Sequence, residues 1–141
     1  MPTITLIFAA AAALVNMWLG MRCGRVRMAE KINHGDGGNS LLQRRMRAQL
    51  NFAENTPIIL IMFAALELAG ANDMVLMVIA PVYIIARICH ALGMDPDSSP
   101  LRMVGVLVTM LTVLILAGYA LYTGYSLLTA ADMPAAMGAA V

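Results

Sequence analysis

Charged residues are scarce in this sequence. Asp, Glu, Lys and Arg make up 12% of its 141 residues, whereas hydrophobic residues make up 61%. A soluble domain carries about a quarter charged residues, because polar groups must cover much of its surface. The low charge content therefore excludes a soluble globular domain and predicts a polytopic membrane protein.

Cysteines are equally few. Cys23 and Cys89 are the only two. One distant pair gives neither the closely spaced ligands of a metal site nor the framework of a disulfide-rich domain. Both are expected to be ordinary reduced thiols. Neither a metal site nor a nucleic-acid partner is expected.

The apolar residues fall into four long runs, at residues 3–21, 48–69, 74–92 and 103–128. Each run approaches or exceeds the ~20 residues that a membrane-spanning helix needs. Lipid offers no hydrogen-bond partners to the backbone, so helices are the expected form. The first run has no basic residue before it and no clear cleavage site, which favours a retained helix over a signal peptide. The sequence predicts an all-α fold, a four-transmembrane-helix bundle that occupies residues 1–141 as one domain.

The basic residues are confined to two of the three connections and their flanks. All nine belong to this group: Arg22, Arg25, Arg27, Lys31, Arg44, Arg45 and Arg47 at the first connection, and Arg87 and Arg102 beside the third. Basic connections stay in the cytoplasm, so both termini are expected on the non-cytoplasmic side. Residues 33–39 are rich in turn formers and predict a flexible loop. The short connection at residues 70–73 predicts that the second and third helices are antiparallel neighbours.

Three polar residues of the second run share one helix face. Arg47, Asn51 and Glu54 stand at positions i, i+4 and i+7, which align at 3.6 residues per turn. A charged side chain in the hydrocarbon region costs about 2.5–3.5 kcal/mol on insertion scales. Such residues usually face the interior of a bundle and serve a function.

The third run repeats this arrangement near its end. Tyr83, Arg87 and His90 are again spaced i, i+4 and i+7, and Arg102 begins the fourth run after Pro100. The polar residues are therefore expected to converge at the cytoplasmic end of the bundle.

Two structural interpretations compete with a functional one. Glu54 and Arg87 can form a pair that locks the second helix to the third, and Arg47 and Arg102 can extend to lipid phosphates. However, guanidinium groups outnumber carboxylates among these residues. This surplus favours a site that holds an anion.

Four segments carry a resemblance to a known family. RAQLNFAENTP, at residues 47–57, resembles the R-A-x-x-N-x-x-E-x-x-P signature of the MAPEG family, the membrane-associated proteins in eicosanoid and glutathione metabolism. YIIARICHALG at residues 83–93 resembles its third-helix pattern, and SPLR at residues 99–102 resembles the segment with its catalytic arginine. GDGGN at residues 35–39 is similar to the loop of bacterial members. The resemblance covers essentially the whole chain.

The resemblance implies a homotrimer in the bacterial inner membrane, with glutathione bound in a cleft between adjacent subunits at the cytoplasmic end. It implies that Arg102 is the catalytic residue that activates the thiol. The implied glutathione-binding residues are Arg47, Asn51, Glu54, Arg87, His90, Tyr83 and Arg22.

The chemistry of these residues suits glutathione. Guanidinium groups bind carboxylates through two parallel hydrogen bonds, and a nearby cation lowers a thiol pKa from about 8.5. The membrane would deliver a hydrophobic small molecule or lipid as second substrate. The expected activity is a membrane-bound glutathione transferase, with a peroxidase reaction on lipid hydroperoxides as its second activity.

Two other functions remain open. The first is a non-catalytic membrane protein of the same fold that binds lipid or glutathione. The second is a small multidrug transporter, which relies on a membrane-embedded carboxylate in its first helix. The first run here has Asn16 and no acid, and the arginines would repel cationic drugs, so the transporter is disfavoured.

Overall fold

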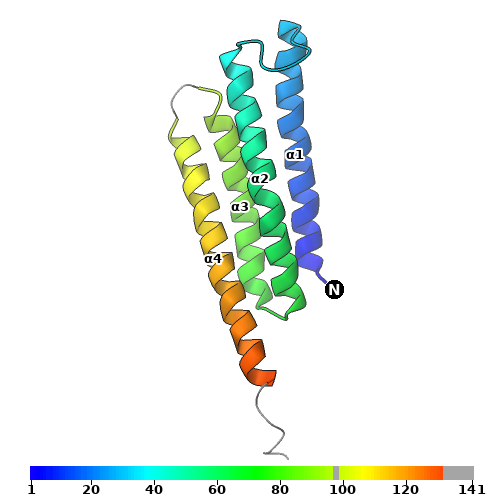
Figure 1. The fold of residues 1–141 in the computed structure, drawn as a ribbon, viewed down its shortest axis with the longest axis vertical. Helices are drawn as coiled ribbons and strands as arrows, with labels where there is room; N and C mark the ends of the chain where they lie inside the picture. The colour runs from blue at the N-terminus through cyan, green and yellow to red at the C-terminus, as the bar shows by residue number, and fades with distance from the viewer. Residues whose placement is uncertain (97–98, 132–141) are drawn as a thin grey trace, which may run out of the picture.

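The computed structural model describes residues 1–96 and 99–131, excluding the side chain of Ala131. The described residues form the helices α1 (Thr3–Glu30), α2 (Ser40–Leu68), α3 (Asp73–Gly93) and α4 (Pro100–Ala131). Figure 1 shows them running alternately up and down, so that the N-terminus and the described end of α4 lie at one end of the bundle. The α1–α2 and α3–α4 connections lie together at the other end. This architecture confirms the all-α prediction.

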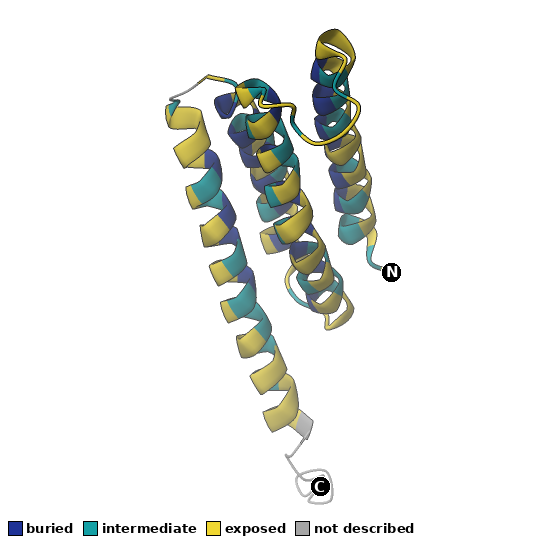
Figure 2. Cartoon of the chain, turned by 45° about the horizontal axis from the view of Figure 1, so that its top comes forward, coloured by how far each residue is buried: buried dark blue, intermediate teal, exposed yellow. Residues whose placement is uncertain are grey.

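Three of the helices, α1, α3 and α4, are long and apolar enough to cross a membrane. Their outer faces carry exposed large hydrophobic residues such as Leu14, Val78 and Leu114, and exposed residues follow the outside of the bundle in Figure 2. In water such a surface would be costly to expose. The protein is therefore a multi-pass integral membrane protein.

The first two helices extend beyond the apolar runs that predicted them. The expected connection between Arg22 and Arg47 was too long, because α1 continues to Glu30 and α2 already begins at Ser40. A hydropathy pattern predicts that a helix ends where charged residues begin, but the arginine-containing turns at the end of α1 and the start of α2 are helical. They are held together by a small buried cluster of Cys23, Val26 and Leu42.

The loop between α1 and α2 is closed by local polar contacts. Lys31 ends α1 in the left-handed conformation, with φ 54°. Asn39 caps α2 by accepting a hydrogen bond from the Leu42 amide at 2.9 Å, as expected for this residue type. Asp36 accepts from the Gly38 amide at 2.9 Å and from Gln43 Nε2 at 2.7 Å. The predicted turn segment, residues 33–39, lies entirely within this loop.

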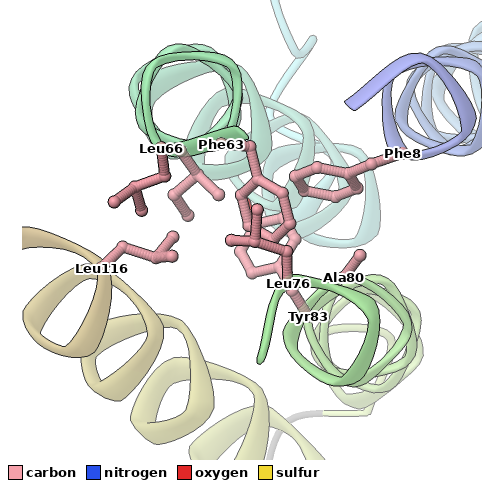
Figure 3. Packing of buried hydrophobic residues seen from close by; sticks show 8 residues of the cluster. Phe8, Phe63, Leu66, Leu76, Ala80, Tyr83 and Leu116 are labelled. Atoms are coloured by element: carbon pink, nitrogen blue, oxygen red, sulfur yellow. The ribbon is translucent and has the colours of Figure 1, made fainter. Parts of the chain in front are cut away.

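The core lies between all four helices and is aromatic at its centre. Phe8 of α1 stacks at a tilt on Phe63 of α2, with ring centroids 4.6 Å apart, and meets the edge of Tyr83 of α3 at 5.8 Å. Leu116 brings α4 into the same cluster. Figure 3 shows these side chains pointing toward one another. The centre of the bundle is thus an ordinary packed core, and it includes Tyr83.

A close approach of α3 and α4 positions the start of α4. A Cβ atom added to Gly93 would overlap the backbone nitrogen of Arg102. A Cβ added to Gly105 would overlap the Cβ of His90 and lie 2.8 Å from the Ala86 carbonyl oxygen. Small residues allow this approach in membrane helices. The two glycines therefore fix the first turns of α4 on the end of α3.

Glu67 ties the end of α2 to the start of α1. Its carboxylate accepts hydrogen bonds from the amides of Ile4 and Thr5, both at 2.8 Å, and from the Thr5 hydroxyl at 2.7 Å. The first amides of a helix have no partner within the helix, and its N-terminus attracts negative charge. Glu67 therefore supplies a cap that the sequence of α1 lacks.

We expect Glu67→Gln to lower the unfolding temperature, because a neutral amide replaces a charged acceptor at a helix N-terminus. Thermal unfolding in detergent micelles would measure the loss. Glu30→Gln, an exposed position at the other end of α1, is the matched control. Equal losses in both variants would contradict the assigned role.

Candidate functional site

The predicted site residues divide sharply by exposure. Arg47, Glu54 and Arg102 are exposed and Asn51 is half-buried, whereas Arg22, Tyr83, Arg87 and His90 are buried. A single protomer therefore does not enclose these residues in one pocket. It presents some of them outward and holds the others within the bundle.

The outward group lies on one face of α2. Arg47, Asn51 and Glu54 alternate with buried Ala48 and Phe52, as the helical spacing requires. Within the described chain, neither Arg47 nor Glu54 forms an ion pair with another residue of the protomer. The face thus carries two opposite charges that have no ionic partner within the described protomer.

A groove of about 470 Å³ between α1 and α2 borders this face. Arg27 and Gln49 supply its polar lining, Cys23 supplies a thiol, and Leu50 forms part of its wall. The guanidinium of Arg27 donates to the sulfur of Met46 at 3.5 Å, which is a weak acceptor. The outward face of α2 is therefore continuous with a partly polar groove.

Arg87 is the most buried of the predicted site residues after Tyr83, with 1% of its surface exposed. Its Nη1 donates to the Thr109 hydroxyl of α4 at 3.1 Å, and its Nη2 lies 3.5 Å from Nδ1 of His90. Its Nε has no hydrogen-bond partner among the described residues. Burying a guanidinium is costly, so this arrangement holds a positive charge inside the α3–α4 interface.

The alternative in which Glu54 pairs with Arg87 is wrong for the described protomer. Glu54 is exposed, and the neighbours that contact the guanidinium of Arg87 are Thr109, His90 and the ring of Phe52, whose centroid lies 5.9 Å away. Arg87 instead joins α3 to α4, through packing and through the neutral hydroxyl of Thr109. The charge on Arg87 is not cancelled by a carboxylate there.

Tyr83 shares a face with Arg87 but belongs to the core. Its hydroxyl forms a hydrogen bond of 2.8 Å with the Thr56 hydroxyl of α2, and its ring packs against Phe8. The side chain has no exposed surface in the protomer. Its visible role is to join α2 to α3.

Arg102 projects from the first turn of α4. The backbone at this position is seated against Gly93, and the side chain is exposed. Ser99 supports the turn by accepting a hydrogen bond from the Leu101 amide at 3.3 Å. A fixed backbone with an outward guanidinium is suited to a ligand that lies outside the protomer.

An ion cluster that the sequence analysis missed joins three parts of the chain. Asp95, in the α3–α4 connection, receives two hydrogen bonds from Arg45 of α2, at 3.0 and 3.1 Å, and pairs with Arg22 of α1 at 2.6 Å. Arg44 donates to its backbone carbonyl at 3.0 Å. The ring of Trp18 lies 4.8 Å from the guanidinium carbon of Arg22. Arg22, predicted to bind glutathione, is therefore held by a carboxylate of its own chain.

The electrostatics of the cluster favour an ionised Asp95. Partial burial alone would raise the pKa of this carboxyl group, but hydrogen bonds from Arg45 and Arg22, together with their charges, bring the pKa below its ordinary value of 3.8. A lowered pKa in the folded state stabilises the fold wherever the group is ionised. The stabilisation is fully present well above pH 3.8 and is lost as the pH falls through the lower pKa of the folded state.

We expect Asp95→Asn to reduce thermal stability at neutral pH and to have a progressively smaller effect in acid. The difference in unfolding temperature from the wild type should shrink between about pH 6 and about pH 2. Scans of both proteins in detergent across this range would measure it. Parallel curves for the two proteins would show that Asp95 does not contribute through its charge.

The chain is similar to one protein family and to two sequences from Escherichia coli. The model of the MAPEG family matches residues 5–122, which include parts of all four helices. The inner membrane protein YecN of Escherichia coli strain K12 is 29% identical over 90 residues, which cover 64% of this chain and 69% of that protein. YecN of Escherichia coli O6:H1 matches to the same extent.

Proposed function

The chain belongs to the MAPEG family, and from this premise we propose that it is a membrane-bound glutathione transferase. It would join the glutathione thiolate to hydrophobic electrophiles in a cleft between subunits of a homotrimer. Reduction of lipid hydroperoxides would be its second activity.

The membrane placement in this proposal has four spans. YecN is named an inner membrane protein, and the same location is proposed here. The 29 residues of α2 extend roughly 43 Å at 1.5 Å per residue, which is sufficient to cross the hydrocarbon layer. Placing the basic end of the bundle in the cytoplasm then puts both termini on the opposite side, in agreement with the charge rule.

The observation that carries the proposal is the outward polar face of α2. Arg47 and Glu54 have no ionic partner in the described protomer, and charges that face lipid at membrane depth are costly. A neighbouring subunit with a zwitterionic ligand between the two would satisfy both charges. Glutathione has two carboxylates, an ammonium group and amides, which match Arg47, Glu54 and Asn51.

Arg102 would act on the thiol of the bound tripeptide. Its positive charge stabilises the thiolate, so the thiol proton is released to water at neutral pH. The sulfur then forms a bond to the electrophilic carbon, and the leaving group departs with the electron pair of its bond. Arg87 would brace α3 against α4 through its hydrogen bond to Thr109, and His90 lies beside its guanidinium.

Calorimetry on the detergent-purified protein tests the proposal. Glutathione and its S-methyl analogue should both bind, and only the free thiol should release a proton, measured in buffers of different ionisation enthalpy. Arg47→Ala should weaken binding of both ligands, while Arg25→Ala, an exposed arginine at the same end, should not. If neither ligand binds, the proposal is wrong; binding without proton release would favour the non-catalytic alternative.

A further inference from the structure

We propose that Asp95 is a positioning residue that sets the place of Arg102 relative to the outward face of α2. This inference rests on the proposed function, because it assigns Asp95 a part in the reaction of that same site. Asp95 would not touch the substrate. It would act through the arginines that hold the α3–α4 connection.

Asp95 is bound by arginines from two other helices. Arg45 binds it with Nε at 3.0 Å and Nη2 at 3.1 Å, which is the two-pronged geometry that guanidinium groups form with carboxylates. Arg22 binds the same carboxylate from α1 at 2.6 Å. Nη1 of Arg45 also donates to the Arg22 carbonyl at 3.1 Å. The connection is thereby fixed to α1 and α2 together.

Asp95 and Arg102 both contact the end of α3. Its amide donates to the Leu92 carbonyl at 3.3 Å, so Asp95 continues directly from the end of α3. The backbone of Arg102 is seated on Gly93 of that same helix end. A displacement of the end of α3 therefore moves the first turn of α4 and the guanidinium that it carries.

The contacts of Asp95 are separate from the contacts that hold α3 to α4. Asp95 takes no part in the latter, which lie at Gly93 and Gly105 and between Arg87 and Thr109. The cluster instead links that helix pair to the arginine-bearing start of α2. Loss of the carboxylate would leave the helix pair intact but would remove this link to α1 and α2 at the end that carries Arg102.

The test measures three quantities for Asp95→Asn: the affinity for glutathione, the thiol pKa of bound glutathione and the turnover of chlorodinitrobenzene. We expect affinity to change little, because the binding face lies on α2. We expect the pKa of the bound thiol to rise and kcat at neutral pH to fall about tenfold, as for a small displacement of a catalytic group. The fall in kcat should diminish at alkaline pH, where the thiolate forms without help.

Asp36→Asn is the matched control, since Asp36 is a carboxylate of the other connection at the same end and bonds to Gly38 and Gln43. It should leave the pH profile of kcat unchanged. If Asp95→Asn does not fold, Arg45→Lys serves instead, because it keeps the charge but loses the two-pronged geometry; the same shift in pH profile is expected.

The outcomes distinguish this inference from the proposed function. A wild-type protein that binds glutathione and forms its thiolate, with a pH profile unchanged in Asp95→Asn or Arg45→Lys, overturns the positioning role alone. A wild-type protein that forms no thiolate overturns both. A lower unfolding temperature with an unchanged pH profile would assign Asp95 a purely structural role and so also overturn the inference.

Discussion

Arg102→Ala is expected to lower the rate of glutathione conjugation about a hundredfold at neutral pH, the factor that corresponds to a rise of about two units in the pKa of the bound thiol, or about 2.7 kcal/mol. Binding of glutathione should be affected much less, because the carboxylates of the tripeptide would be held by Arg47 and its neighbours on α2. The structure gives Arg102 an exposed side chain on a fixed backbone. A positive charge beside the bound thiol stabilises the thiolate.

The pH dependence separates this role from damage to the fold. If Arg102 acts on the bound thiol, the wild type has the lower thiol pKa and should form the thiolate already near neutrality. Without it, the pKa rises, the fraction of thiolate at neutral pH falls, and the rate should recover as the pH approaches the new pKa. A variant that merely unfolds would lose activity at every pH.

Steady-state rates with chlorodinitrobenzene over a range of pH would measure the effect. Arg102→Lys should retain part of the activity, because it keeps a positive charge without the fork of donors. Arg25→Ala, also an exposed arginine, controls for a change of net charge at this end of the bundle. An Arg102→Ala enzyme as fast as the wild type would exclude the assigned catalytic role.

The four helices could be predicted because each contains a long apolar run, and hydropathy reports the solvent that a segment prefers. Their ends could not be predicted in the same way. The turns that carry Arg25 and Arg44 are helical although they are polar, because Val26 and Leu42 are buried between them. That packing depends on two segments meeting, which periodicity within one segment does not reveal.

The candidate site was predictable as a set of residue types but not as an arrangement. Spacing correctly places Arg47, Asn51 and Glu54 on one face of α2. It gives the same prediction for Tyr83 and Arg87, yet these are buried because α4 and α2 cover that face of α3. Helical spacing defines a face, while the neighbouring helices decide whether that face is exposed.

Asp95 shows why the ion cluster was missed. Its partners lie far away in sequence, on α1 and α2, and nothing in the local pattern identifies them. The available signal was its position, since it is an acid in a connection at the arginine-rich end of the chain. Arg22, which the resemblance implied as a glutathione-binding residue, is instead engaged by Asp95.

Gly105→Ala is expected to lower the free energy of unfolding by about 3 kcal/mol, at the upper end of the range for overpacking a close interface. The added methyl group would overlap the Cβ of His90 and lie 2.8 Å from both the Ala86 carbonyl oxygen and the Cα of His90. Two of these three atoms belong to the backbone and cannot rotate away. Helix α4 must therefore move off α3, which also breaks the hydrogen bond of 3.1 Å between Arg87 and Thr109.

Gly118→Ala provides a matched control on the same helix, because a Cβ there meets no atom within 4 Å. In a helix, alanine is favoured over glycine by roughly 0.5–1 kcal/mol, so this variant should be as stable as the wild type or slightly more stable. Thermal unfolding of the three proteins in the same detergent would measure the contrast. Since Gly105 also seats the first turns of α4, Gly105→Ala should lose conjugation activity together with stability. Equal stability of the two alanine variants would mean that α3 and α4 are not packed as closely as the structure shows.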